Sequence, residues 1–276
     1  MITHILKIKT WQNIAGFCQG LPSVKRKAFF VLHVVLYQTK SISWYNNGTF
    51  MHCIASISQR LAWLIGRPLF VFFLHFRVYG KENLKGFQNG IIFASNHISE
   101  GDGILISGSF NLFSKRLPLY FIAREKDFYK NTLFHGILYT KTLFHCFGAY
   151  PAIVGLRDFE KSLAAHINLL QRGRNIAIFP EGTRSRDGKL LHAKGGVVAL
   201  VKATNKPVVP VAITGILKIT PKEFFLRKRF VKVRFGKPIF PDELFAGYAD
   251  PLPADYGKIA TTKVMTAIEK ILPEEK

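Results

Sequence analysis

The hydrophobic and polar positions alternate with a regular rhythm along most of the chain. After Gly80, short apolar runs alternate with longer stretches in which apolar residues recur at the spacing of an α-helix. The short runs predict strands at residues 90–94, 119–123, 175–179, 208–213 and 231–235. The longer stretches predict helices at residues 103–113, 128–141, 159–171, 193–203 and 256–271. Strands that alternate with helices predict an α/β fold with a mixed, largely parallel sheet flanked by helices.

Residues 61–78 form an almost wholly apolar segment, interrupted by Arg67, His75 and Arg77, with Pro68 near its middle. A transmembrane helix needs about 20 such residues. An arginine at its centre costs about 3 kcal/mol on insertion. We therefore interpret this segment as a broken helix that lies at a membrane interface or re-enters the membrane, with a full span as the alternative.

The pattern before this segment is weaker. Residues 1–50 contain scattered lysines, a break at Pro22 and one apolar run at 28–37, and we expect a poorly ordered or non-native extension there. Residues 51–80 are then predicted to form a membrane-associating helical arm, and residues 81–276 the main domain. A chain of 276 residues is long enough for one domain of about 200 residues with an added arm.

The charge of the chain is strongly uneven. It has 39 Lys and Arg against 17 Asp and Glu, a net charge of +22, and its first acidic residue is Glu82. The basic segment before Glu82 is also the most apolar and aromatic part of the chain, a mixture that favours the headgroup region of an anionic bilayer. Nucleic acid is the alternative polyanion, since residues 218–237 hold eight basic residues against one acid and residues 230–235 alternate like an edge strand. The sequence contains no recognisable DNA- or RNA-binding module.

The three cysteines, Cys18, Cys53 and Cys146, are far apart and form no CxxC pair. They indicate neither a disulfide framework nor a zinc site, and they fit a reducing compartment. The histidines are scattered, so no metal site is expected. The first 25 residues lack the compact apolar core and cleavage site of a secretory signal. We therefore expect a monotopic or peripheral protein on the cytoplasmic face of a membrane, which is the inner membrane if the source is bacterial.

A first candidate for chemistry follows the predicted strand 90–94. His97 lies in the polar turn after this strand, and Asp102 lies at the start of the next helix. Across such a corner the carboxylate can fold back onto the imidazole, fix its tautomer and stabilise its protonated form. The alternative is a solvated turn histidine beside an aspartate that caps the helix.

A second candidate follows the predicted strand 175–179, in the sequence Pro180-Glu181-Gly182-Thr183-Arg184-Ser185. Arginine offers a planar fork for a phosphate, the hydroxyl groups are donors, and glycine lets a ligand approach the backbone closely. This set fits a phosphorylated polyol. A turn with a structural glutamate–arginine pair is the alternative.

Together with Val209-Pro210-Val211, these two motifs resemble the ordered motifs of the glycerolipid acyltransferases, in particular the 1-acyl-glycerol-3-phosphate acyltransferase family, over about residues 60–240. The resemblance implies that His97 is the general base, that Asp102 orients it, and that residues 81–276 are the catalytic domain. It also implies a substrate site that contains Asn96, Glu181, Gly182, Thr183 and Arg184.

The same resemblance implies an activity. A fatty-acyl group would pass from a thioester of acyl carrier protein or coenzyme A to lysophosphatidic acid, giving phosphatidic acid in phospholipid biosynthesis. These thioesters are co-substrates, and no cofactor is expected. A covalent acyl-enzyme has no support in the sequence, because no serine lies in a Gly-x-Ser-x-Gly elbow and no cysteine has a recognisable partner.

One motif of the family is incomplete. The family usually has Gly-x-x-Pro-Val followed closely by an arginine that helps to hold the substrate phosphate, whereas this chain reads Gly148-Ala149-Tyr150-Pro151-Ala152-Ile153-Val154. Arg157 is the nearest substitute. Arg124, Lys126 and Lys194 are further candidates. The helix expected to begin near Asp158 adds backbone N–H groups that can help to bind an anion.

Two other functions fit the same residues. The acceptor can be another lysophospholipid or a different polyol. A non-catalytic lipid-binding protein would keep the membrane arm, but it would not require His97 and Asp102 together.

Overall fold

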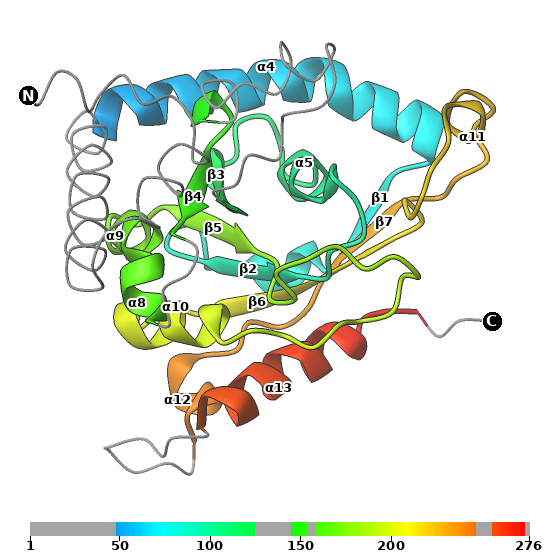
Figure 1. Cartoon of the computed structure of the whole chain (residues 1–276). Coiled ribbons are helices and arrows are strands. Elements are labelled where there is room, and N and C mark those ends of the chain that lie inside the picture. Colours follow the sequence, from blue (N-terminus) through cyan, green and yellow to red (C-terminus); the bar gives the residue numbers. More distant parts are fainter. Residues whose placement is uncertain (1–47, 125–144, 154–157, 247–255, 274–276) are drawn as a thin grey trace, which may run out of the picture. The chain divides into compact units, whose positions relative to one another are not determined.

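Figure 1 shows the chain as a computed structural model. The structure describes residues 48–124, 145–153, 158–246 and 256–273. The chain divides into two compact units after Met51, and the unit His52–Lys276 contains the whole described sheet. The predicted extension over residues 1–50 lies almost entirely outside the described residues, and so does the predicted helix 128–141.

Within the described residues, seven strands form one sheet in the order β1-β7-β6-β2-β5-β3-β4. All neighbouring strands are parallel except β6 and β7, so the predicted mixed, largely parallel sheet is confirmed. The central strands are buried along almost their whole length, because apolar neighbours cover both faces. The strands are β1 Arg77–Tyr79, β2 Ile92–Ser95, β3 Leu119–Arg124, β4 Ala149–Ala152, β5 Asn175–Ile178, β6 Val208–Thr214 and β7 Lys232–Phe235.

Helices cover both faces of this sheet (Figure 1). One face carries α4 (Gly48–Leu74) and α5 (Asp102–Gly108), and the other carries α9 (Ala164–Gln171), α10 (Gly196–Thr204) and α13 (Tyr256–Glu269). A hydrophobic core that includes Leu74, Ile106 and Phe93 joins α4 and α5 to the sheet. The shorter helices are η1 Lys81–Leu84, α8 Phe159–Ser162, α11 Pro221–Phe225 and α12 Pro241–Leu244.

Helix α4 runs for 27 residues and passes through Pro68 without ending, so the predicted break is wrong. A proline removes one backbone hydrogen bond, but contacts on the inner side hold α4 on the domain. The Gln59 side chain donates to the carbonyl oxygen of Leu119 at 2.6 Å, and the Trp63 indole donates to that of Phe110 at 2.8 Å. Arg67 also points inward and donates to the carbonyl oxygen of Gly108. Its charge therefore does not interrupt the outer face.

The outer face of α4 is apolar and exposed. The stretch Met51–Leu74, 24 residues, is long and apolar enough to cross a membrane by length and composition alone, and 11% of its most apolar window is buried. Seven large apolar side chains on α4 are 43–70% exposed: Ile57, Leu61, Leu64, Ile65, Leu69, Val71 and Phe72. The helix thus has a packed inner side and a bare apolar outer side.

The sheet differs from the prediction at its edges. β7 is not an edge strand, because β1 pairs beyond it, with Arg77 opposite Lys232. β1 has three residues and follows the apolar α4 closely, so it leaves no separate strand pattern. β4 contains Pro151 and was also missed; it lies at the other edge, where a proline is tolerated. The predicted helix 159–171 is divided at Leu163 into α8 and α9.

Candidate active site

The two candidate motifs meet at the carboxyl end of the sheet. β2 pairs in parallel with β5 on one side and with β6 on the other, so the residues that follow β2 and β5 lie at the same edge. The backbone N–H of His97 donates to Oε1 of Glu181 at 3.1 Å, and the backbone N–H of Ser185 donates to the carbonyl oxygen of His97 at 2.7 Å. The turn 180–185 therefore holds the backbone of His97 on both sides.

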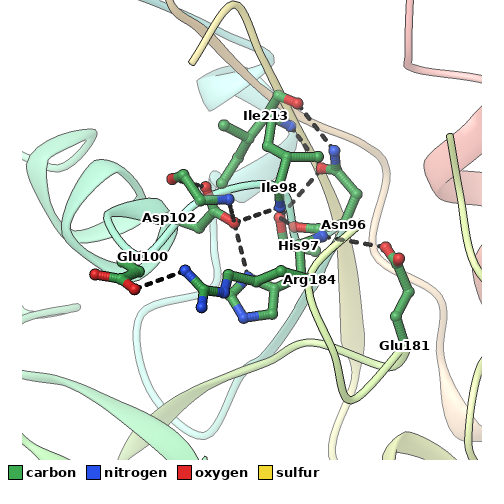
Figure 2. Close-up of polar contacts among 10 residues, drawn as sticks. Asn96, His97, Ile98, Glu100, Asp102, Glu181, Arg184 and Ile213 are labelled. Atoms are coloured by element: carbon green, nitrogen blue, oxygen red, sulfur yellow. Dashed lines mark hydrogen bonds and ion pairs between the residues drawn. The ribbon is translucent and has the colours of Figure 1, made fainter. Parts of the chain in front are cut away.

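Asp102 is the first residue of α5, is buried, and closes onto His97 (Figure 2). Its Oδ2 lies 2.8 Å from Nδ1 of His97. The same oxygen accepts the backbone N–H groups of Ile98 at 2.7 Å and Ser99 at 2.9 Å. The Ser99 hydroxyl donates to Oδ1. These contacts fix the carboxylate, and the structure brings His97 and Asp102 together across the strand–turn–helix corner, as predicted.

The second ring nitrogen of His97 is the one placed for chemistry. The ring stacks on Phe179 with centroids 4.1 Å apart and 17° between the planes, and the side chain is 21% exposed. Because the proton on Nδ1 is directed to Asp102, Nε2 carries the free lone pair of the neutral imidazole. Among the described residues, the ring has a hydrogen bond to Asp102 only. Nε2 can therefore accept a proton from a substrate.

Asn96 bonds to the protein backbone, whereas the resemblance implies that it contacts the substrate. It is buried, its Nδ2 donates to the carbonyl oxygen of Ile213 at 2.9 Å, and its Oδ1 accepts the N–H of Ile213 at 2.8 Å. Both ends of the amide thus join the end of β2 to β6. This contact fixes the backbone from which His97 projects. The substrate contact of Asn96 remains a prediction.

Glu181 is also turned toward the backbone. It is 1% exposed, and its two oxygens accept the N–H groups of His97 and Leu191, each at 3.1 Å. Burial raises the pKa of Glu181, against the lowering effect of these two hydrogen bonds. The resemblance implied a substrate contact for Glu181, and nothing in the sequence marks the backbone of Leu191 as its partner.

Gly182, Thr183 and Arg184 form the outer part of the turn. Gly182 has a φ of +64°, which favours glycine. The side chain of Lys194 lies over it, so that a Cβ added at Gly182 would lie 3.3 Å from Nζ. Thr183 and Arg184 are exposed. Arg184 pairs with Glu100 at 2.7 Å (Figure 2), with the two side chains 39% and 56% exposed. The turn thus offers a hydroxyl group and the Arg184 cation at the catalytic edge, and the Lys194 side chain adds a second cation over Gly182.

The structure says less about the other residues that the sequence suggests as a second cation for the substrate phosphate. Arg157 and Lys126 lie outside the described residues, and Arg124 is the last residue of β3. The start of α8 does not offer the anion site that was expected there. Oδ1 of Asp158 already accepts the N–H groups of Glu160 at 3.0 Å and Lys161 at 3.2 Å. In the part of the chain that the structure describes, no group of His, Cys, Asp or Glu could hold a metal ion.

The sequence matches the acyltransferase family model over residues 75–214. This range is just over half of the chain and contains both motifs of the candidate site. The chain therefore belongs to the acyltransferase family, and the family resemblance inferred from the motifs is confirmed.

Two plant proteins show how the similarity is distributed. A chloroplastic 1-acyl-sn-glycerol-3-phosphate acyltransferase of Brassica napus is 40% identical over 76 residues, which are 27% of this chain and 22% of that protein. A 1-acyl-sn-glycerol-3-phosphate acyltransferase of Limnanthes douglasii is 25% identical over 188 residues, 68% of this chain and 60% of that protein. The chain thus spans less than two thirds of the length of either relative.

A solved structure shows the same fold. The crystal structure of the 1-acyl-sn-glycerophosphate (LPA) acyltransferase PlsC from Thermotoga maritima aligns with a TM-score of 0.51 at 23% sequence identity. The alignment covers 87% of this chain and 96% of that chain. The two proteins therefore share the fold of a largely parallel sheet flanked by helices.

Proposed function

We propose that this chain transfers a fatty-acyl group from an acyl thioester to the free hydroxyl of lysophosphatidic acid, giving phosphatidic acid. The observation that carries the proposal is the contact of 2.8 Å between Nδ1 of His97 and the buried Asp102, which leaves Nε2 free on a side chain that is 21% exposed. A histidine held in this way can act as a general base. The names of the plant relatives support the acceptor.

The chemistry follows from the position of Nε2. His97 takes the proton of the acceptor hydroxyl while the alkoxide oxygen attacks the thioester carbonyl carbon. The tetrahedral intermediate then collapses, the C–S bond breaks, and the proton on His97 passes to the departing thiolate. Asp102 stabilises the imidazolium between these two steps, because its carboxylate lies on the other ring nitrogen. General-base catalysis of this kind contributes about 10²–10⁴-fold.

The phosphate of the acceptor would bind at the outer part of the turn 180–185. A phosphate monoester carries about −1.5 to −2 charges at pH 7, so it needs more than one cation. Arg184 supplies a planar fork. The Lys194 ammonium lies over Gly182 in the same turn, which makes it the described residue best placed as the second cation. Arg157 remains the alternative from the sequence.

The membrane would hold the enzyme by the outer face of α4. That face is apolar, whereas the inner face contacts β3 through Gln59, and α5 and the residues after it through Arg67 and Trp63. Burying one face at the lipid boundary keeps these polar contacts, so an interfacial helix fits better than a full span. We propose attachment at the cytoplasmic face, where acyl carrier protein and acyl coenzyme A are both available as donors.

One observation favours a second acceptor class. Positions 153 and 154, where the incomplete motif would carry its arginine, hold Ile153 and Val154. With one phosphate ligand fewer, a lysophospholipid with a diester headgroup, which has a single negative charge, becomes the alternative acceptor.

An acyl-transfer assay separates these proposals. The purified protein in mixed micelles is given lysophosphatidic acid or a diester lysophospholipid, each with acyl coenzyme A and with acyl carrier protein thioester. We expect phosphatidic acid to form at least tenfold faster than the diacyl product of the diester acceptor. A reversed preference would replace lysophosphatidic acid by the diester class, and no transfer to any acceptor would contradict the proposed function.

A further inference from the structure

The loop around α11, residues 220–230, exposes large apolar side chains. Phe225 is 67% exposed, Leu226 is 54% exposed and Phe230 is 57% exposed. Soluble proteins rarely expose contiguous apolar groups of this size, and such patches mark sites of interaction. Neither the catalytic motifs nor the predicted membrane arm includes this segment. We refer to residues 220–230 as the α11 loop.

The α11 loop is fixed to the carboxyl end of α4, as Figure 1 shows. The ring of Phe224 stacks on Phe73 with centroids 4.8 Å apart. The Arg227 guanidinium lies 4.2 Å from the ring centroid of Phe72 and donates from Nε to the carbonyl oxygen of Phe72 at 2.9 Å. His75 stacks on Phe230 at 4.5 Å. The exposed side chains of the loop therefore lie in a fixed position beside the end of the apolar face of α4.

The same loop is strongly basic. Glu223, its one acidic residue, pairs with Arg229 at 2.9 Å. Lys222, Arg227 and Lys228 are exposed, and in the described residues none of the three takes part in an ion pair. Hydrogen bonds from the backbone and hydroxyl of Thr220 and from Arg229 lower the pKa of Glu223. Three cations therefore remain beside the exposed aromatic groups.

We propose that the α11 loop is a second membrane contact, which inserts its apolar side chains at the surface of an anionic bilayer while its lysines bind lipid phosphates. Aromatic and basic residues side by side suit the headgroup boundary. The continuity with the apolar face of α4 favours a lipid surface over a protein partner, because the loop packs directly on the carboxyl end of that face.

This contact would also set the position of the active site, a consequence that rests on the proposed function. The α11 loop follows β6, and Ile213 in β6 is held by Asn96, the residue before His97. A bilayer bound at both α4 and the α11 loop fixes the tilt of the sheet. It thereby directs the catalytic edge to the lipid surface from which the headgroup of the acceptor projects.

A fluorescent probe tests the contact without any turnover. Leu226→Cys is labelled with an environment-sensitive dye in full-length protein whose three natural cysteines are replaced by serine. The matched control is Thr262→Cys, an exposed position on α13, on the opposite face of the sheet. With vesicles that contain one third phosphatidylglycerol, we expect a blue shift and quenching by spin-labelled lipid at position 226 and neither at position 262. A dye at 226 that stays in water on vesicle-bound protein would overturn the proposal.

The lysines are tested separately. Lys222→Gln with Lys228→Gln removes two exposed charges, and each lysine near an anionic surface contributes roughly fivefold to binding. We expect about 25-fold weaker insertion of the labelled position 226 into anionic vesicles, with little change on neutral ones. An equal effect on both kinds of vesicle contradicts the assignment of the lysines to lipid phosphates. Shielding of position 226 by a protein in place of lipid would make the loop a docking site for that protein.

Discussion

The carboxylate of Glu181 accepts the backbone N–H of His97 at 3.1 Å, so the second motif supports the backbone of the first. The contact lies at the point where the turn after β5 crosses the end of β2. Its other oxygen accepts the N–H of Leu191, and the residue is 1% exposed, so both carboxylate oxygens are directed to the backbone and away from solvent. The geometry makes Glu181 a positioning residue for the base.

Glu181→Gln should therefore lower kcat by roughly tenfold, because an amide cannot accept at both ends and a buried unpaired N–H costs about 1–3 kcal/mol. The KM for the acceptor should change by less than about twofold. Steady-state kinetics with saturating donor measures both constants. A rise in the acceptor KM with unchanged kcat would instead indicate that Glu181 contacts the substrate.

Arg184→Ala should raise the KM for lysophosphatidic acid at least tenfold and leave the KM for the acyl donor unchanged, since a charge-assisted contact contributes about 1.5–3 kcal/mol. Glu100→Gln is the matched variant. It removes the partner that now holds Arg184 at 2.7 Å, so it should lower the acceptor KM. If Arg184→Ala changes only the KM for the acyl donor, Arg184 binds the donor and not the phosphate of the acceptor.

The second phosphate cation can be assigned with three variants. Lys194→Ala should weaken the use of lysophosphatidic acid about tenfold, because Nζ lies over Gly182, in the turn that also carries Arg184. Arg157→Ala is expected to have a comparable effect if Arg157 replaces the missing motif arginine, and Arg157→Lys should then restore only part of the activity because an ammonium lacks the bidentate fork. Kinetics with the lysophosphatidic acid and diester acceptors provides the readout. If neither alanine variant changes the kinetics with lysophosphatidic acid, a phosphate monoester is contradicted as the acceptor.

Attachment by α4 should resist salt. Apolar burial is insensitive to screening, whereas the attraction of basic residues to anionic lipid is not. Sedimentation with anionic vesicles at about 1 M salt should therefore leave most of the protein in the membrane fraction, while Leu64→Asp with Ile65→Asp, on the exposed face, should release it. Complete release of the wild-type protein by salt would mean that this face is not inserted in lipid.

The central part of the fold could be predicted from the sequence, because β2, β5 and β6 are short apolar runs buried on both faces. The edge strands of the sheet could not be predicted in this way. β1 has three residues next to an apolar helix, and β4 contains Pro151, so neither leaves a strand pattern. The course of α4 through Pro68 depends on contacts with β3 and α5, which are distant in the sequence and are not part of local helix propensity.

In the candidate site, too, some contacts could be predicted from the sequence and others could not. His97 and Asp102 were predictable because a strand–turn–helix corner brings their side chains together. The contacts of Asn96 and Glu181 were not, because their partners are backbone groups of Ile213, His97 and Leu191, and any residue type supplies those. The place of Lys194 over Gly182 depends on the path of the loop 182–194, which no residue pattern fixes.

The most direct test is the rate of acyl transfer by His97→Ala, with folding checked by circular dichroism and by vesicle binding. His97 is partly exposed in a turn, so its loss should leave the fold intact. We expect a fall in kcat/KM of about 10²–10⁴-fold, with Asp102→Asn nearly as damaging because the carboxylate that holds Nδ1 is lost. A folded, membrane-bound His97→Ala protein that retains more than about a tenth of the wild-type rate would contradict general-base catalysis by His97.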